Sequence, residues 1–227
     1  MFFAAVLSGK WNANQRPYLT GGPLNGNYTL SRIVFYWGKN FKYGSFHTIE
    51  NIRKALEIQV IYIKRKYVNV EEAAKYDDGI VIISYIFEMR FQMNLSLEPI
   101  LIAMDEIRKS NCGIHINVFK LDKMLPPFKN DYFLYNSNHK LQTGESFKNV
   151  TWIVPRETFC VSFYQLKRFS ASLTNELLPV KKTFLYLPNC LLKPSLFLVN
   201  SSKGEAQKTC LPMPFYKDVV NMHITIT

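Results

Sequence analysis

The sequence predicts a mainly β protein of the α+β class, with a few short helices. Hydrophobic residues make up 48% and aromatic residues 15% of its 227 residues, which is typical of a chain that folds around a β-rich core. The blocks 30–38 and 55–63 are rich in β-branched and aromatic residues, as strands are. Residues 80–87 form an almost unbroken apolar run, the pattern of a strand buried on both faces. At this length we expect one domain over residues 1–227.

Turn residues and helical spacing mark the other elements. Residues 21–26 are rich in glycine and include a proline, which predicts a turn before the first strand. Residues 71–75 predict one helical turn. Apolar residues recur at three- and four-residue spacing from Leu97 to Ser110, which predicts an amphipathic helix. A capping-box pattern that begins at Ser162 predicts another short helix. Residues 1–20 are apolar and then polar, and no strand is predicted there.

The chain is basic, with a formal net charge of +11. Lysine and arginine are scattered along it, and the densest run is Lys64-Arg65-Lys66. This charge is compatible with an ordinary basic surface, or with attraction to a polyanion such as an acidic, sulfated glycan. No nucleic-acid-binding motif accompanies the charge, so nucleic acid is not an expected partner.

The sequence predicts no membrane span, because no apolar run reaches the roughly 18–20 residues that a membrane helix needs. Residues 1–8 are apolar but short and lack a basic start, so no signal peptide is predicted. The compartment stays open. As it stands we expect a cytoplasmic chain, and a secreted one if a preceding segment carries a signal peptide.

Four cysteines are spread over the second half of the chain. They are Cys112, Cys160, Cys190 and Cys210. No two of them form a C-x-x-C pair, so their spacing does not indicate a structural zinc site. An even number permits disulfides without requiring them, and their redox state stays open.

Three motifs in order carry a family resemblance. They are Ile33-Val34-Phe35-Tyr36-Trp37-Gly38, Gly44-Ser45-Phe46-His47-Thr48 and Ala55-Leu56-Glu57-Ile58-Gln59. They resemble the α-carbonic anhydrase family, which carries F-H-F-H-W-G, G-S-E-H-T and A-E-L-H-L-V-H-W in the same register. Further along, Val150-Thr151-Trp152-Ile153-Val154 is similar to the family's V-T-W-I-V strand. The resemblance covers about residues 17–170. It implies a large, twisted, mostly antiparallel sheet with few short peripheral helices.

The resemblance places the three zinc-binding histidines of the family on Val34, Tyr36 and Gln59. Valine has no donor atom, and tyrosine and glutamine are poor zinc ligands. His47 matches a histidine that is structural in the family, buried and hydrogen-bonded. The remaining histidines, His115, His139 and His223, form no pair at ligand spacing. We therefore expect the family's zinc to be lost, with no other cofactor and no catalytic residue.

Further positions around the former site also depart from the family. Arg32 stands where the family has a glutamine, and Phe46 replaces the glutamate of G-S-E-H-T. Gln142, followed by Thr143, replaces the threonine that bonds the zinc hydroxide. Glu57 matches the family, but its histidine partner is replaced, so a buried carboxylate there needs another partner. Arg32 either pairs with Glu57 across the site or points to solvent.

The expected pocket wall consists of Ile61, Ile82, Leu141 and Trp152. Two states of the former pocket stay open. Its side chains either pack as a filled core, since apolar replacement of a buried polar site is often neutral or stabilising, or they leave a narrow cavity.

Members of the family carry further residues before the position that matches Pro17, including an aromatic cluster, a strand and the histidine that shuttles protons. We expect this N-terminal part to be absent here, from a truncated or a shortened domain. Without it, an edge of the sheet would be exposed.

The resemblance implies a non-catalytic carbonic-anhydrase-related protein that acts as a binding or scaffold module for an unknown protein partner. One alternative is a basic surface protein that binds sulfated glycans, as in poxvirus cell-surface-binding proteins, which Tyr36-Trp37-Gly38-Lys39 and residues 77–84 resemble. Another alternative is the carbonate dehydratase (lyase) activity of the parent family with a displaced metal site.

Overall fold

The computed structural model describes residues 2–9, 16–110, 114–116, 121–125, 131–140, 146–171, 197–198 and 222–226. The strands are β1 Phe2–Gly9, β2 Tyr18–Leu19, β3 Tyr28–Gly38, β4 Thr48–Ile49, β5 Ile52–Arg53, β6 Leu56–Lys64, β7 Ile80–Arg90, β8 Ile114–Ile116, β9 Tyr132–Lys140, β10 Ser146–Pro155, β11 Phe159–Ser162, β12 Phe197–Leu198 and β13 Met222–Ile226. The helices are α1 Val70–Ala73, the 3-10 helix η1 Leu95–Leu97, α2 Glu98–Ser110, α3 Leu121–Met124 and α4 Phe163–Ala171.

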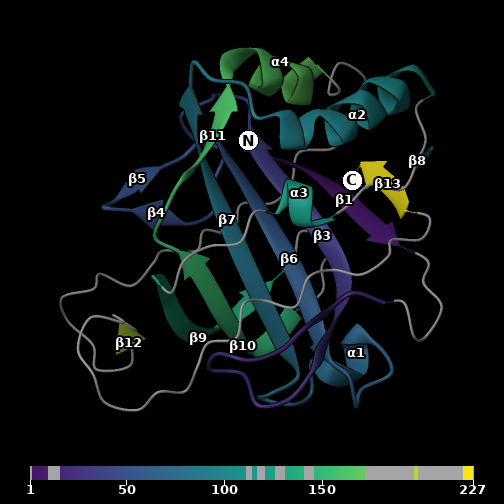
Figure 1. Ribbon diagram of the computed structural model, residues 1–227, viewed down its shortest axis with the longest axis vertical. Helices are drawn as coiled ribbons and strands as arrows, with labels where there is room; N and C mark the ends of the chain where they lie inside the picture. Colours follow the sequence, from purple (N-terminus) through teal and green to yellow (C-terminus); the bar gives the residue numbers. More distant parts are fainter. Residues whose placement is uncertain are drawn as a thin grey trace.

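One large sheet dominates the molecule, with α2 and α4 together at one end and α1 at the opposite end (Figure 1). The strand order is β12-β9-β10-β7-β6-β3-β1-β13-β8, with β2 added on β3 and β11 added on β7. Strand pairs are antiparallel except for β10 and β11, which both run parallel to β7. The predicted fold class, a large and mostly antiparallel sheet with few short helices, is confirmed.

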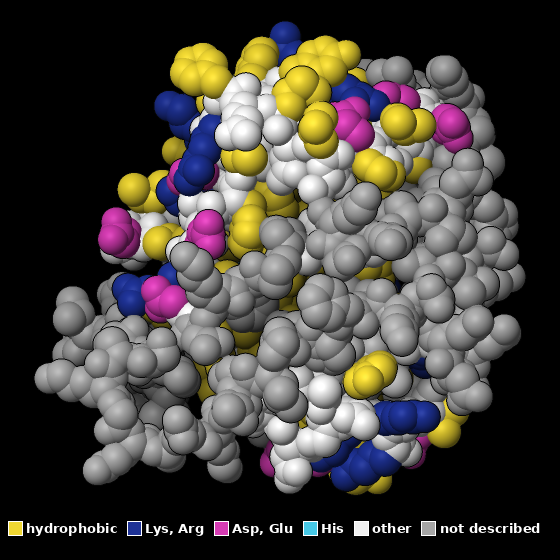
Figure 2. All heavy atoms as spheres, viewed as in Figure 1, with side chains coloured by type: hydrophobic (Ala, Val, Ile, Leu, Met, Phe, Trp, Pro, Cys, Tyr) yellow, Lys and Arg dark blue, Asp and Glu magenta, His cyan; other side chains and the backbone are white. Residues whose placement is uncertain are grey.

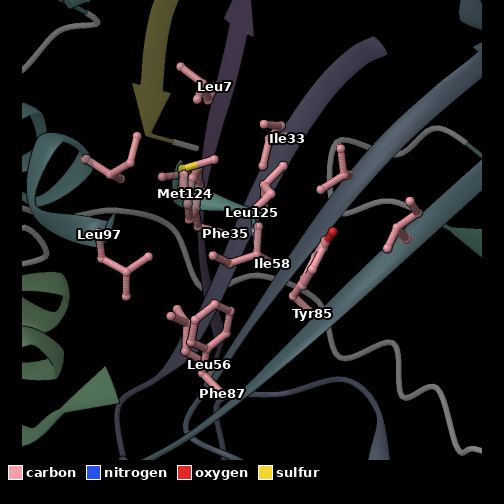
Figure 3. Close-up of a cluster of buried hydrophobic side chains, with 14 of the residues drawn as sticks. Leu7, Ile33, Phe35, Leu56, Ile58, Tyr85, Phe87, Leu97, Met124 and Leu125 are labelled. Atoms are coloured by element: carbon pink, nitrogen blue, oxygen red, sulfur yellow. The ribbon is translucent and has the colours of Figure 1, made fainter. Parts of the chain in front are cut away.

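The central strands β3, β6 and β7 are buried on both faces. On one face, side chains such as Phe35 and Ile58 meet Leu97 and Met124 (Figure 3). The helices α2 and α4 cover this face side by side, and Arg168 of α4 bonds Glu98 and Asp105 from α2. Each fully buried Leu, Ile or Phe contributes about 1.5–3 kcal/mol from its transfer out of water, so this layer holds the helices on the sheet.

The predicted capping box at the start of α4 is present in both directions. The backbone N–H of Gln165 donates to the Ser162 hydroxyl at 3.1 Å, and the N–H of Ser162 donates to the Gln165 side-chain oxygen at 3.2 Å. Two N–H groups that a helix start leaves without intrahelical partners are thereby satisfied. The helix predicted over residues 97–110 is also present, as η1 followed by α2.

Strands β1 and β2 lie within residues 1–20, where the sequence predicted none and where the N-terminal strand of the family was expected to be absent. β1 pairs antiparallel with β3 along all but its last residue, from Phe2 opposite Gly38 to Ser8 opposite Arg32. Most of β1 is apolar and buried, so no polar and apolar alternation marks it in the sequence. The edge of β3 that faces away from β6 is therefore covered by β1 and not exposed.

Candidate functional site

The second face of the sheet brings the predicted site residues together. Residues directly opposite each other on neighbouring antiparallel strands share a face, so the register defines rows across β1, β3, β6 and β7. The rows are Ala4-Tyr36-Glu57-Ile86, Val6-Val34-Gln59-Ser84 and Ser8-Arg32-Ile61-Ile82. The three positions that the resemblance assigns to the zinc ligands thus lie next to one another, with Val34 directly opposite Gln59 and Tyr36 one row away.

The former ligand positions are buried in an apolar cluster. Val34 and Tyr36 pack there with Phe46, whose ring meets the Tyr36 ring edge-on at 4.5 Å between centroids. The predicted wall residues Ile61, Ile82 and Trp152 belong to the same layer and are fully buried. The predicted positions Leu141, Gln142 and Thr143 lie outside the described residues.

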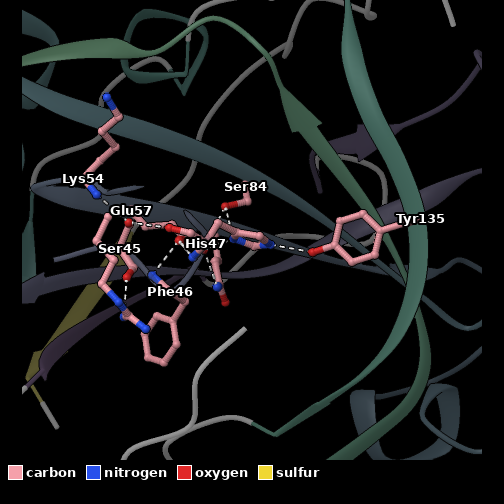
Figure 4. Close-up of polar contacts among 9 residues, drawn as sticks. Ser45, Phe46, His47, Lys54, Glu57, Ser84 and Tyr135 are labelled. Atoms are coloured by element: carbon pink, nitrogen blue, oxygen red, sulfur yellow. Dashed lines mark hydrogen bonds and ion pairs between the residues drawn. The ribbon is translucent and has the colours of Figure 1, made fainter. Parts of the chain in front are cut away.

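Glu57 is the centre of a buried hydrogen-bond network beside this cluster (Figure 4). Its Oε2 accepts the backbone N–H groups of Phe46 at 2.8 Å and His47 at 2.9 Å. Its Oε1 accepts from His47 Nδ1 at 2.7 Å. On its other side, His47 Nε2 shares a hydrogen bond with the Tyr135 hydroxyl. The network therefore fastens the loop before β4 to β6 and β9, and it gives His47 the buried, hydrogen-bonded position expected for it.

Gln59 and Ser84 complete the shell of Glu57. The Gln59 side-chain amide donates to Glu57 Oε1 at 2.7 Å, and the Ser84 hydroxyl donates to the same oxygen at 2.8 Å. Arg32 lies opposite Ile61, four positions along β6 from Glu57. In the structure, Glu57 is therefore bonded by Gln59, Ser84 and His47. The sequence had suggested Arg32 as its partner.

The electrostatics of the network favour an ionised carboxylate. Burial on its own raises the pKa of Glu57, but attraction to His47 and the hydrogen bonds from His47 and Gln59 outweigh it and lower the pKa to about 2. Burial, and to a lesser degree the charge of Glu57, raise the pKa of the Tyr135 hydroxyl well above its usual value. Tyr135 is therefore a neutral hydrogen-bonding group, and Glu57 is a negative charge held within the core.

His139 is a buried residue of this face that the sequence did not single out. It is 3% exposed, and its ring meets Trp152 edge-on at 4.9 Å between centroids. Neither ring nitrogen has a hydrogen-bond partner among the described residues. Burial and then repulsion from His47 lower the pKa of His139 to about 3, with Glu57 acting in the opposite direction. Alternation along β9 puts residues 133, 135, 137 and 139 on one face, but the residues of β10 that they meet depend on a register that shifts between Phe147 and Val150.

The side chains at the former ligand positions do not fit zinc. Val34 offers no donor atom, and Tyr36 packs against Phe46. The amide nitrogen of Gln59 is committed to Glu57, while its oxygen has no hydrogen-bond partner among the described residues. The described ranges also contain no group of three or more His, Cys, Asp or Glu residues placed to hold a metal ion.

One surface feature bears on the glycan partner considered from the sequence. Lys64 and Lys66, from the densest basic run, both reach the carboxylate of Asp78, which also accepts from the Tyr67 hydroxyl. This acidic partner offsets part of the charge that a glycan would meet.

In the part of the chain that the structure describes, no helix has the length and apolar character needed to cross a membrane.

Comparison with known proteins identifies the family. The sequence profile of the eukaryotic-type carbonic anhydrases matches residues 5–184. This range is wider than residues 17–170, over which the sequence motifs carry the resemblance, and it includes most of β1. Carbonic anhydrase 1 of Oryctolagus cuniculus is 30% identical over 158 residues, which cover 69% of this chain and 66% of that protein. The frame of three motifs, the sheet that carries them and these matches agree: the chain belongs to the eukaryotic-type, or α, carbonic anhydrase family.

Proposed function

We propose that this chain is a carbonic-anhydrase-related protein that holds no zinc at the family position, does not hydrate carbon dioxide, and acts as a binding or scaffold module. The observation that carries the proposal is the sheet register, which puts Val34, Tyr36 and Gln59 together on one buried face. These are the positions that the family motifs assign to the zinc-binding histidines.

The family's chemistry explains why these replacements matter. Carbonic anhydrase is itself the standard example of a zinc ion held by three histidines, with a fourth position open for water. The metal lowers the pKa of that water to about 7, and the resulting hydroxide attacks carbon dioxide. Without the three imidazoles there is no donor set to hold the ion in that geometry. The residues in their place provide packing through Val34 and Tyr36, and a hydrogen bond to Glu57 through Gln59.

The packing favours a filled core rather than a reactive cavity. Val34, Tyr36 and Phe46 belong to one buried apolar cluster with Ile61, and the Tyr36 and Phe46 rings are in contact. Replacing a buried polar site by packed apolar side chains is often neutral or stabilising, so the sheet can keep its shape without the metal. A surface of such a rigid sheet is a suitable platform for a partner, which fits a binding or scaffold role.

The test is the zinc content of the purified chain, measured by elemental analysis after dialysis against a weak chelator. We expect close to zero zinc per chain. We also expect no more carbon dioxide hydration than in a Gln59→Leu variant, whose side chain has no donor atom at that position.

Zinc close to one per chain that disappears in Gln59→Leu, together with hydration that disappears with it, would contradict the proposal. Zinc that is retained in Gln59→Leu lies elsewhere, and the hydration assay on that sample then decides whether the parent activity survives at a displaced site. Loss of folding is excluded by recording near-ultraviolet circular dichroism of both proteins.

A further inference from the structure

One edge of the molecule exposes an unusual set of large hydrophobic side chains. It combines the end of β7, the loop and η1 that follow it, the start of α4 and the loop after β3. Phe91 is 107% exposed, so no neighbour covers its ring, and Leu95 is 75% exposed. The exposed members of this edge, here called the aromatic edge, are Tyr43, Met89, Phe91, Met93, Leu95, Phe163 and Tyr164. Figure 2 shows hydrophobic side chains gathered along the upper outline, above the position of α4 in Figure 1.

The segments of the aromatic edge are fastened to one another. β11 runs parallel to the end of β7, with Ser162 opposite Arg90. The side chain of Gln165 accepts the backbone N–H of Asn94 at 2.9 Å and donates to its carbonyl at 2.7 Å. The ring of Phe41 meets the ring of Phe163 at 5.3 Å between centroids, which attaches the loop after β3. The edge is therefore a fixed surface and not a set of unrelated loops.

The charges along the aromatic edge leave a positive excess. Three acidic residues here have basic partners: Glu88 pairs with Lys54 and Arg90, and Glu98 and Asp105 pair with Arg168. Glu106 of α2 is exposed as well, so the excess is counted against it. Further exposed lysines lie beside the apolar side chains, namely Lys39, Lys42 and Lys167. Lys167 Nζ lies 4.6 Å from the centre of the Phe163 ring. Aromatic rings and lysines are thus interleaved on one surface.

We propose that the aromatic edge docks on an anionic lipid surface. Contiguous exposed apolar patches of this kind mark interaction sites. The apolar side chains lie at the tip of a strand and the start of a helix, where Phe91 projects from the surface. A fluid lipid interface accepts such a projecting side chain without a complementary groove, and amphipathic surfaces bind it by apolar burial together with attraction to anionic headgroups. Phe91 and Leu95 enter the acyl boundary, and Lys42 and Lys167 face the lipid phosphates.

A sulfated glycan would use the lysines but not the exposed Phe91 and Leu95, so it does not account for the apolar half of the edge. A second copy of this chain could cover the apolar half, but it would bring the same positive excess to the contact, and like charges would repel. A lipid surface satisfies both halves at once. The inference does not depend on whether the chain holds zinc.

The experiment is sedimentation of the whole chain with vesicles, either of phosphatidylcholine alone or with about a third of phosphatidylserine. We expect binding to the anionic vesicles that weakens as salt is added. Phe91→Ser should reduce the partition coefficient about tenfold, because it removes one large apolar side chain from the contact. The pair Lys42→Gln with Lys167→Gln should reduce it about twenty-five-fold on anionic vesicles, since each lysine contributes roughly a fivefold factor.

The matched control is Val68→Ser. Val68 is 82% exposed but lies just before α1, at the opposite end of the sheet from α4 (Figure 1). It should leave vesicle binding unchanged. Binding that Phe91→Ser and Val68→Ser reduce equally, or no binding to either vesicle, would overturn the proposal. Concentration-dependent dimers that Phe91→Ser abolishes, without vesicle binding, would assign the edge to a second copy and overturn it as well.

Discussion

Replacing the buried imidazole of His139 by an apolar side chain should remove a defined part of the acid sensitivity of the fold. His139 lies on β9 against Trp152, and neither of its ring nitrogens has a hydrogen-bond partner among the described residues. A buried imidazole without partners resists protonation, because the charged form would lose its hydration without compensation. His139→Leu keeps a side chain of similar size and has no titratable group. We expect this variant to be at least as stable as the parent near pH 7.

The magnitude follows from the difference in pKa between the folded and unfolded chain. Burial first, and His47 second, lower the pKa of His139 in the folded chain from 6.5 to about 3. Below pH 6.5 the unfolded chain therefore binds a proton that the folded chain does not, so the free energy of unfolding falls as the pH falls. From pH 7 to pH 5 this amounts to about 2 kcal/mol, and by pH 3 to about 4 kcal/mol. Glu57 adds little to the pH dependence of the free energy of unfolding above pH 4.5, because folding lowers its pKa from 4.5 to about 2.

Urea unfolding at pH 7 and at pH 5 measures the effect, provided that the slope with denaturant is the same for both proteins. The parent should lose about 2 kcal/mol more than His139→Leu between the two pH values. Phe147→Leu is the matched control, since Phe147 is a buried neighbour of His139 without a titratable group. It should lower stability by about 1 kcal/mol at both pH values. Equal pH dependence of the parent and His139→Leu would refute the argument that His139 is buried uncharged.

Two further substitutions test the packing around the site. Glu57→Gln should lower the free energy of unfolding by about 3–5 kcal/mol at pH 7, because its new amide NH₂ would face N–H and O–H donors that the carboxylate accepts, and His47 would lose a charged hydrogen-bond partner. It should also remove the loss of stability on acidification from pH 4.5 towards pH 2, and a loss below 1 kcal/mol at pH 7 would contradict the network. Gly44→Ala should cost about 2–3 kcal/mol, because a Cβ there would lie 1.7 Å from the carbonyl oxygen of Ala55. Gly21→Ala is its control, because nothing lies within 4 Å of a Cβ at that position, although its φ of +90° leaves a strain of about 1 kcal/mol. Equal losses of stability in the two variants would show that the close contact at Gly44 does not determine the cost.

The sheet and the site frame could be predicted because their signals are local. The β-branched and aromatic blocks fixed β3 and β6, and the motifs fixed which residues of each strand face the site. The alternation of side chains then put Val34 and Tyr36 on one face, and the register of the antiparallel pair put Gln59 on the same face. The capping box of α4 is local as well, so Ser162 and Gln165 predicted it correctly.

The remaining parts depend on contacts between distant segments. β1 carries no alternation, because both of its faces are covered, and its partner β3 begins almost twenty residues later. Ser84 reaches Glu57 only because β6 and β7 pair with Gln59 opposite Ser84. His139 faces Trp152 because β9 and β10 continue as a hairpin past a bulge between Phe147 and Val150. A bulge adds an unpaired residue to one strand and shifts the pairing beyond it. The sequence does not show where the bulge falls, so it does not reveal which residue of β9 lies over the site.

The contacts of Glu57 show how the fold can hold this carboxylate without a bound metal. The resemblance assigns Glu57 the task of orienting a zinc-bound histidine, and that histidine position is now Gln59. The amide of Gln59 presents an N–H to the same carboxylate, and Ser84 adds a hydroxyl. Glu57 is therefore satisfied without the imidazole that it would orient, and a buried charge that would otherwise cost several kcal/mol remains paired. Its contacts with Phe46, His47 and, through His47, Tyr135 hold a loop and two strands together. Glu57 and His47 therefore have a structural role that does not depend on a bound metal.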